Sequence, residues 1–378
     1  MAKRRGNNEG NIRQRTDHSW EASLQFEDKR HYVYGQTKKE VKSKLADIQN
    51  DIYNGTLVEQ NDITVAEWMR TWIDCYTAKT KQSTKARYDQ DIRNHIIPEI
   101  GAFPIQALSD LTVQRFLNHC QKNKGLSEKS LKNIYLVLNK ALAKAQSKGL
   151  IKVNPCSEAE IPSYEEPRKE MRPLKDTEVP LFLKVIEEDE FEWLFFVAMF
   201  TGMRESEIIG LTWDSIDWDK EKIHLKKQLI RTKERGSRYV FTTLKNKQSR
   251  DFNVPPSVIK ALKKVKAAQA EWKLQSGALY NNTDGLVFTN KLGEHLCTHT
   301  VYMHFKKIVE KMGLPEVRFH DLRHTYATLA LQNGVDIKTV SSNLGHATVA
   351  FTMDKYAHVS ETMQKDSVTK MEAFIASL

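Results

Sequence analysis

The chain contains 378 residues and carries a formal net charge of +10 at pH 7, with 40% hydrophobic and 28% charged residues. One hydrophobic core rarely organises that length, so two or three domains are expected, and the composition excludes a largely disordered chain. The sequence also argues against a membrane or secreted protein. It has no apolar run long enough to span a bilayer, and residues 1–15 lack the apolar core of a signal peptide.

The cysteines and the basic residues narrow the class further. The sequence has four cysteines, Cys75, Cys120, Cys156 and Cys297. Their wide spacing predicts reduced thiols rather than a disulfide framework or a zinc site. Lysine and arginine strongly outnumber acidic residues between residues 220 and 250. This clustering favours a polyanionic partner, although a solvated charged surface would give the same pattern.

The first segment, residues 1–58, is expected to form a small three-stranded sheet followed by one helix. Three short runs rich in aromatic and branched residues, 10–15, 19–26 and 29–35, are separated by turn-like residues. Thr37 is expected to cap a helix over residues 38–55, with Gly55 at its end. The candidate DNA-binding residues of this sheet are Arg13, Arg15, Lys29 and Arg30. One basic face of such a sheet fits a DNA groove, and a solvated sheet face is the equally weighted alternative.

The second segment, residues 62–158, is predicted to be entirely helical. Val65, Trp68, Met69, Trp72 and Ile73 have the spacing of one apolar helix face. Further helices are expected over residues 84–100, 111–121 and 127–149. Prolines among charged residues then mark a linker at residues 159–173.

The third segment, residues 174–378, is predicted to be mainly helical with one small antiparallel sheet. Apolar helices are expected over residues 179–189 and 190–200, and helices resume near residue 257. Residues 222–230, 238–245 and 250–255 alternate as strands of the sheet, which puts Lys245 at the tip of a hairpin.

This third segment also carries residues suited to phosphoryl transfer. Arg204 follows Gly202 at the expected start of a helix, and His320 and Arg323 share one helix face. Two arginine forks can neutralise a phosphodiester and its transition state, and a tyrosine hydroxyl can attack phosphorus. Histidine can take up the phenolic proton and lysine can protonate the departing oxygen. Each residue alone is more often structural, and the conjunction is what favours catalysis.

The stretches TGMRESEIIGLTWDSID, LKNKQSR, HDLRHTYATL and LGHATVAFTMDKYAH resemble the tyrosine recombinases, or phage-type integrases. The resemblance implies catalytic roles for Arg204, Lys245, His320, Arg323, His346 and the nucleophile Tyr356. It implies duplex cleavage through a 3′-phosphotyrosine link and a Holliday junction, with no cofactor and no metal. The arginines would clamp the phosphate, His346 would hydrogen-bond to it, His320 would serve Tyr356, and Lys245 would protonate the leaving 5′ oxygen.

The resemblance also suggests roles for the other segments. Residues 1–58 look like the arm-binding domain of lambda-like and conjugative-transposon integrases. Residues 62–158 look like the core-binding domain, with Lys85 and Arg87 as candidate DNA contacts. The implied partners are core-type and arm-type attachment sites, a homotetramer on DNA, an excisionase and a DNA-bending host factor. The expected location is the bacterial cytosol, on the nucleoid when bound to DNA. The alternatives are a catalytically silent DNA-binding regulator and a relaxing enzyme like a type IB topoisomerase.

Two expectations concern the C-terminal region. His346 and Tyr356 would lie far apart on one continuous helix, so a break near Met353 or Asp354 is expected to bring them together. The apolar Val349, Phe351 and Met353 would then set their separation. Residues 369–378 have an apolar stripe that could fold onto its own domain or, as the resemblance implies, pack on a neighbouring protomer. The stripe consists of Met371, Phe374, Ile375 and Leu378.

Overall fold

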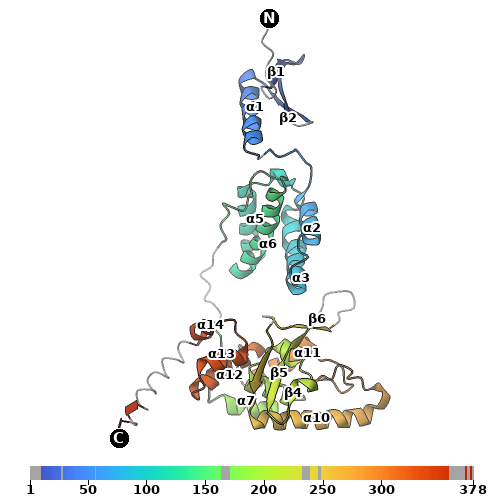
Figure 1. The fold of residues 1–378 in the computed structure, drawn as a ribbon, viewed down its shortest axis with the longest axis vertical. Coiled ribbons are helices and arrows are strands. Elements are labelled where there is room, and N and C mark those ends of the chain that lie inside the picture. The colour runs from blue at the N-terminus through green and yellow to red at the C-terminus, as the bar shows by residue number, and fades with distance from the viewer. Residues whose placement is uncertain are drawn as a thin grey trace. The chain divides into compact units, whose positions relative to one another are not determined.

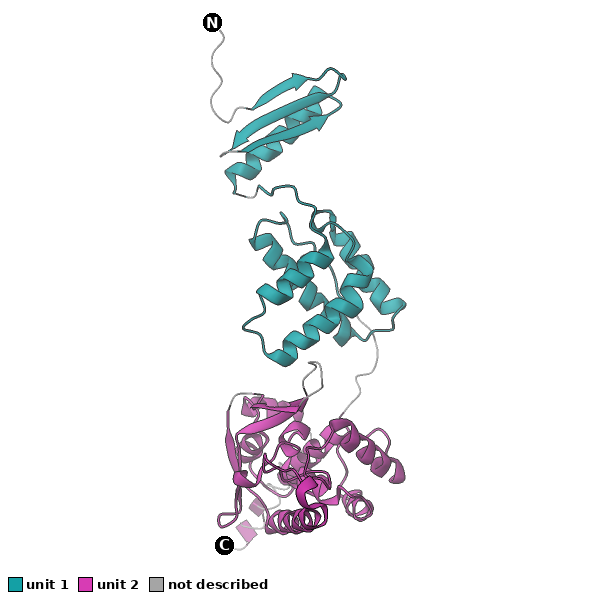
Figure 2. Ribbon diagram, turned by 90° about the vertical axis from the view of Figure 1, so that its right-hand side faces the viewer, with its two compact units in different colours: residues 1–167 teal, residues 168–378 magenta. Residues whose placement is uncertain are grey.

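The computed structural model describes residues 10–26, 29–55, 57–162, 171–231, 239–245, 248–356, 371–372 and 375–376. The chain forms two compact units, residues 1–167 and 168–378 (Figure 2). Among the described residues, no helix has the length and apolar character needed to cross a membrane. The predicted turn near residues 233–237 and most of the predicted linker lie outside the described residues.

Unit 1 begins with the predicted three-stranded sheet and helix. The strands are β1 (Asn11–Gln14), β2 (Trp20–Phe26) and β3 (Lys29–Gly35), antiparallel in that order, and the helix is α1 (Lys38–Tyr53). Side chains of a strand point alternately to its two faces, and Ala22 and Leu24 lie on the face of β2 that packs against Val41 and Leu45 of α1. The expected cap is confirmed, because the Thr37 side chain accepts a hydrogen bond from the Glu40 amide.

The rest of unit 1 is the predicted helical block. Its helices are α2 (Val65–Cys75), α3 (Gln82–Asp91), a π-helical turn (Ile92–Ile96), α4 (Ile97–Ile100), a 3-10 turn (Ile105–Ala107), α5 (Asp110–Lys122) and α6 (Glu128–Ser147). The apolar face of α2 is buried as predicted, and Trp68 donates its indole N–H to the Ala141 carbonyl of α6 at 2.8 Å. The π-helical turn interrupts the helix expected over residues 84–100 just before Pro98. A proline ring crowds the carbonyl four residues earlier, which accounts for the irregular turn.

Unit 2 is mainly helical around one large core (Figure 1). Its helices are α7 (Val179–Ile186), α8 (Glu192–Thr201), α9 (Glu205–Ile208), α10 (Pro256–Ser276), α11 (Thr298–Lys311), α12 (Phe319–Gln332), α13 (Ile337–Leu344) and α14 (Val349–Lys355), with 3-10 turns at Trp213–Ser215 and Gly277–Leu279. Phe182, Phe195 and Phe305 are fully buried and join α7, α8 and α11. Together with unit 1, this matches the predicted multidomain, mainly helical class.

Within the described part of unit 2, the strands form two antiparallel sheets, where the sequence pattern predicted one. One sheet has the order β4 (Ile216–Asp217), β5 (Lys222–Leu225), β8 (Arg250–Asn253), and the other pairs β6 (Lys227–Arg231) with β7 (Tyr239–Thr243). The run 222–230 therefore splits, because Leu225 pairs with Arg250 while Lys227 pairs with Thr243. Alternating apolar residues identify strands, but they do not specify the partner of each strand.

Candidate active site

Arg204 lies in the short connection between α8 and α9. Gly202 ends α8 in the left-handed conformation at φ 62°. A Cβ there would lie 2.6 Å from the Tyr326 ring and 2.8 Å from a Leu344 methyl carbon, so only glycine fits this approach to α12 and α13. Arg204 lies at the predicted start of the next helix, as the capping residue directly before α9, and its Nη2 donates to the Gly345 carbonyl at 3.3 Å.

A buried carboxylate that the sequence analysis did not select holds Arg204 in place. Glu207 is 0% exposed and accepts the Arg204 Nη1–H at 2.7 Å and the Arg204 amide at 2.9 Å. Arg250 donates to the same carboxylate at 3.1 and 2.6 Å, and its Nε donates to the Asn343 carbonyl at 2.7 Å. The sequence signal was available, since Glu207 stands three residues after Arg204 beside the buried Ile208.

Arg323 supplies the second predicted guanidinium from within α12. It is 3% exposed, its Nη1 donates to the Gly202 carbonyl at 2.8 Å, and its Nη2 donates to the Leu344 carbonyl. Burial, together with the charge of Arg204, lowers the pKa of Arg323 to about 9. The group remains a cation at neutral pH. Two neighbouring guanidinium groups held by neutral carbonyls and one carboxylate form a site suited to an anion.

His346 lies between α13 and α14, which corrects the predicted position of the helix break. The break falls at residues 345–348, because Gly345 adopts a left-handed φ of 63° and Thr348 caps α14. Tyr356 directly follows the last residue of α14. A glycine followed three residues later by a capping threonine is the local signal that the apolar spacing did not take into account.

Thr352 links the two residues that the break brings together. His346 Nδ1 lies 2.8 Å from the Thr352 hydroxyl oxygen, and the Tyr356 amide donates to the Thr352 carbonyl at 3.1 Å. The expected spacer Met353 is instead 52% exposed, while the Phe351 ring lies edge-on to His346. Burial and the charge of Arg323 lower the pKa of His346 to about 4, so any phosphate contact would come from Nε2–H of a neutral ring.

Tyr356 is buried, and its hydroxyl contacts a histidine that the sequence analysis passed over. The side chain is 2% exposed and packs with Ala327, Leu331, Val340 and Leu344. Its oxygen lies 2.7 Å from His324 Nδ1. Burial raises the pKa of Tyr356 to about 12, with Arg323 opposing.

The predicted partner of Tyr356, His320, lies one helical turn before His324. The two rings are 5.2 Å apart and perpendicular. Partial desolvation and the charge of Arg323 lower the pKa of His320.

Lys245 does not occupy a hairpin tip. It is exposed in the connection from β7 to β8, which belong to different sheets. Leu244, the preceding residue, lines a polar cavity of about 170 Å³ together with Arg204, Arg250, Ser342 and His346. Because one water occupies roughly 30 Å³, this cavity has room for a phosphate group. The position of Lys245 is therefore beside the cationic cavity.

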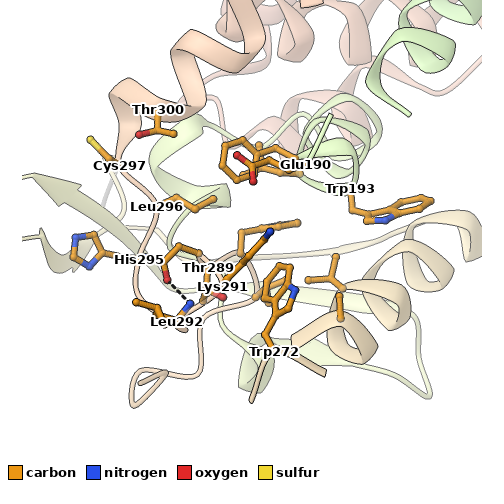
Figure 3. A pocket seen from close by; sticks show the side chains of 17 residues that line it. Glu190, Trp193, Trp272, Thr289, Lys291, Leu292, His295, Leu296, Cys297 and Thr300 are labelled. Carbon is orange, nitrogen blue, oxygen red and sulfur yellow. Dashed lines mark hydrogen bonds between the residues drawn. The ribbon is translucent and has the colours of Figure 1, made fainter. Parts of the chain in front are cut away.

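A larger cavity of unit 2 has different chemistry (Figure 3). It measures about 610 Å³, and its walls include Trp193, Trp272 and Leu296, with Glu190 and Lys291 at polar positions. None of the six predicted catalytic residues lines it. The small cavity lined by Arg204 and Arg250 is the candidate site, because stabilisation of a phosphoryl transition state requires cations rather than apolar volume.

The candidate DNA-binding residues of unit 1 lie on more than one surface. The pairing of Arg13 with Glu21, and of Glu21 with Tyr34, puts Arg13 and Tyr34 on the sheet face away from α1. Arg15 lies over the Tyr34 ring at 5.3 Å, and the exposed Tyr32 and Tyr34 stack in parallel. Arg30 lies on the same face as Tyr34, because the two residues are four positions apart on β3.

The remaining candidates have other surroundings. Lys29 belongs to the other face of the sheet and pairs with Glu59 at 2.6 Å. Lys85 and Arg87 lie on α3, partly buried, and Arg87 pairs with Asp91 at 3.7 Å.

Comparison with known proteins defines the class of this chain. The phage integrase family matches residues 174–363, and the family's N-terminal SAM-like domain matches residues 64–121. The chain belongs to the phage integrase family of tyrosine recombinases, enzymes that cleave and rejoin DNA.

Particular relatives and solved structures agree with this class. The chain is 32% identical to a XerC-like tyrosine recombinase of Caldanaerobacter subterraneus subsp. tengcongensis over 89% of each protein. It is 28% identical to the ICEBs1 integrase of Bacillus subtilis, covering 80% of this chain and 82% of the relative. The Tn1549 transposon integrase bound to circular intermediate DNA has the same fold (TM-score 0.66, 21% identity, covering 80% of this chain and 99% of that one). The lambda integrase in its tetramer on a Holliday junction does too (TM-score 0.59, 16% identity, 93% and 96%).

The buried Glu207 should make stability depend on pH. Burial alone would raise its pKa, but hydrogen bonds and charge from Arg250, together with Arg204, lower it from 4.5 to about 2. The depressed pKa stabilises the fold above about pH 4.5, and this contribution is lost as pH falls toward 2. Glu207→Gln should destabilise unit 2 by about 3 kcal/mol at neutral pH, because Arg204 and Arg250 lose the buried negative charge with which they pair. The free energy of unfolding of this variant should also depend less on pH below pH 5.

Urea unfolding of the full chain, with the transition of unit 2 assigned by limited proteolysis, measures this effect. The exposed Glu187→Gln is the matched control and should leave the profile unchanged. An unaltered acid dependence in Glu207→Gln would contradict the assignment.

Proposed function

We propose that this chain is an integrase that recombines specific DNA sites to integrate and excise a mobile element, a prophage or a conjugative transposon. The observation that carries the proposal is a cationic cavity lined by Arg204 and His346. Arg323 donates to the Gly202 and Leu344 carbonyls close to these two residues, and the Tyr356 side chain packs against Leu344 as well. The charge of Arg323 acts on both Tyr356 and His346, which supports a single reaction centre.

The proposed reaction is a transesterification at the scissile phosphate. The Tyr356 hydroxyl gives its proton to a neighbouring histidine, and its oxygen bonds to phosphorus as the bond to the 5′ oxygen breaks. Lys245 protonates that departing 5′ oxygen. Arg204 and Arg323 bind the nonbridging oxygens, and His346 donates a further hydrogen bond. A 5′-hydroxyl of the partner strand reverses the step, making and then resolving a Holliday junction. Each phosphodiester is exchanged for an equivalent one, so the reaction needs no energy-rich cofactor.

Tyr356→Phe should abolish covalent protein–DNA complexes, because it removes only the attacking oxygen. A nicked suicide substrate, which loses the leaving strand, traps the complex for denaturing gel electrophoresis. Tyr302→Phe, at a half-exposed tyrosine of α11, is the matched control and should retain wild-type yield. Adducts that persist in Tyr356→Phe would overturn the assignment of the nucleophile.

We also propose that residues 1–58 bind arm-type sites, residues 62–158 bind core-type sites, and residues 159–173 link them to the catalytic domain 174–378. The sheet face that carries Arg13, Arg15 and Arg30 with two exposed tyrosines supports the first role. Lys85 and Arg87 are the proposed core-site contacts, and Lys29 is a peripheral phosphate contact. An excisionase and a DNA-bending host factor would set direction, so adding either should change the excision yield.

Charge removal should separate the two kinds of site. Arg13→Ala with Arg30→Ala should weaken arm-site binding and flatten its salt dependence, while core-site binding stays unchanged, because each lost phosphate contact lowers the salt slope by about one unit. Lys85→Ala with Arg87→Ala should do the reverse. Filter binding across a salt series measures both. Equal losses at both sites in either variant would contradict the division of roles.

We propose further that the enzyme acts as a homotetramer coupled through its C-terminal tail. Within the part of the tail that the structure describes, Met371 and Ile375 expose more than half of their surface, while Phe374 and Leu378 lie outside that part. Exposed apolar side chains at these two positions favour packing on a second protomer. The lambda integrase, which shares the fold, forms a tetramer on a Holliday junction.

Truncation after residue 360 should weaken synapsis or disturb cleavage and leave binding to a single core site largely intact. Burial of the stripe would hold protomers together without touching DNA. Gel-shift titration and a two-site recombination assay separate the two effects. Recombination at wild-type yield by the truncated chain would refute the coupling role.

A further inference from the structure

The hydroxyl of the proposed nucleophile has one hydrogen-bond partner among the described side chains, and that partner is His324. The Tyr356 oxygen and His324 Nδ1 lie 2.7 Å apart. Building on the function proposed above, we propose that His324 is a further catalytic residue, which accepts the phenolic proton of Tyr356 as its oxygen attacks phosphorus.

Burial of the hydroxyl makes a nearby acceptor necessary. Tyr356 is 2% exposed and is surrounded by Ala327, Leu331, Val340 and Leu344, so bulk water has little access to the phenol. The proton released on attack therefore passes to a group already in contact. His324 meets the geometric requirement for a general base, a basic nitrogen within 2.6–3.2 Å of the proton that it removes.

His320 is less well placed for this role. Its ring packs perpendicular to that of His324 at 5.2 Å, and the His324 ring in turn lies 6.0 Å from the tyrosine ring. Among the described residues, no hydrogen bond joins His320 to Tyr356. His320 and His324 are four residues apart on α12, so both face the same side of that helix. His320 is thus a neighbour of the base rather than the direct partner of the nucleophile.

Burial, with the cations around His324 as a second cause, keeps His324 and Tyr356 neutral in the free protein. Burial first, and then His320, lower the pKa of His324 to about 4, whereas burial raises the pKa of Tyr356 to about 12. The proton therefore rests on Tyr356 in the free protein. The groups that act on His324 or respond to it are His320, Asp321, Arg323 and Arg318 of α12, Tyr356 after α14, and His346 before it. A phosphate bound to Arg323 would offset the cations and make protonation of His324 easier.

The step balances with the groups already named. The phosphorus–Tyr356 oxygen bond forms while the phosphorus–5′ oxygen bond breaks. The phenolic proton moves to His324 Nδ1, which requires the neutral tautomer with its hydrogen on Nε2. Lys245 supplies a proton to the 5′ oxygen. In rejoining, His324 returns its proton to the Tyr356 oxygen as the incoming 5′-hydroxyl gives one to Lys245.

His324→Asn tests the proposal, since its amide lies near the position of Nδ1 but takes up no proton at working pH. Single-turnover cleavage of a suicide substrate at saturating protein should slow by about 10²-fold or more, with DNA binding unchanged. The acid limb of the wild-type pH–rate profile should disappear. A more acidic fluorinated tyrosine at position 356 should restore part of the lost rate, a rescue that a purely structural role for His324 would not give.

His320→Asn is the matched comparison on the same helix face and should slow cleavage less. Cleavage by His324→Asn near the wild-type rate would overturn the proposal, as would a slow variant that the fluorinated tyrosine does not rescue. His324→Gln is the second variant, and loss of DNA binding in both variants would make His324 a folding residue and also overturn it. If the wild-type chain formed no covalent complex, the proposed function would fail instead.

Discussion

The candidate site depends on the buried carboxylate of Glu207 and its two arginine partners. Glu207 of α9 is fully buried and accepts hydrogen bonds from Arg204, just before α9, and from Arg250 of β8. Arg250 in turn donates to the Asn343 carbonyl of α13. Such an ion network costs desolvation energy and is retained where it fixes geometry. Here it joins a helix, a strand and a second helix that are distant in sequence, and so sets the direction of the Arg204 guanidinium.

The second arginine uses the backbone in the same way. Arg323 donates to the Gly202 carbonyl after α8 and to the Leu344 carbonyl at the end of α13. Figure 1 shows α12, α13 and α14 side by side in unit 2. Both guanidinium groups are therefore preorganised by groups that also close the fold, which lowers the reorganisation needed when an anion binds. A change at Glu207 or Gly202 would alter the geometry of the candidate site and the packing of unit 2 together.

Much of this arrangement could be predicted from sequence, because local patterns determine it. The spacing of apolar residues predicted helices α2 and α6, and Thr37 was correctly predicted to cap α1. The family was indicated by the order of the residues Arg204, His320, Arg323, His346 and Tyr356. The predictions that were wrong concern long-range strand pairing. The strands expected in one sheet form two in the described residues, and β7 and β8 do not form the hairpin expected around Lys245, because they pair with different strands. Arg250 and His324 were missed because each acts through a contact with a residue that is distant in sequence. Glu207 was missed although its position three residues after Arg204 offered a local signal. The position of the helix break was predicted wrongly because it was inferred from the spacing of apolar residues. Gly345, which ends α13, and Thr348, which caps α14, are the residues that mark the break.

The central claim is that Tyr356 becomes covalently linked to DNA in a site built by Arg204 and Arg323. The most direct measurement is mass spectrometry of the peptide that remains attached to DNA after a suicide-substrate complex is digested with nuclease and protease. The expected result is one modified peptide, with a nucleotide joined through its 3′ phosphate to the Tyr356 oxygen. A nucleotide on any other residue, or a linkage through a 5′ phosphate, would contradict it.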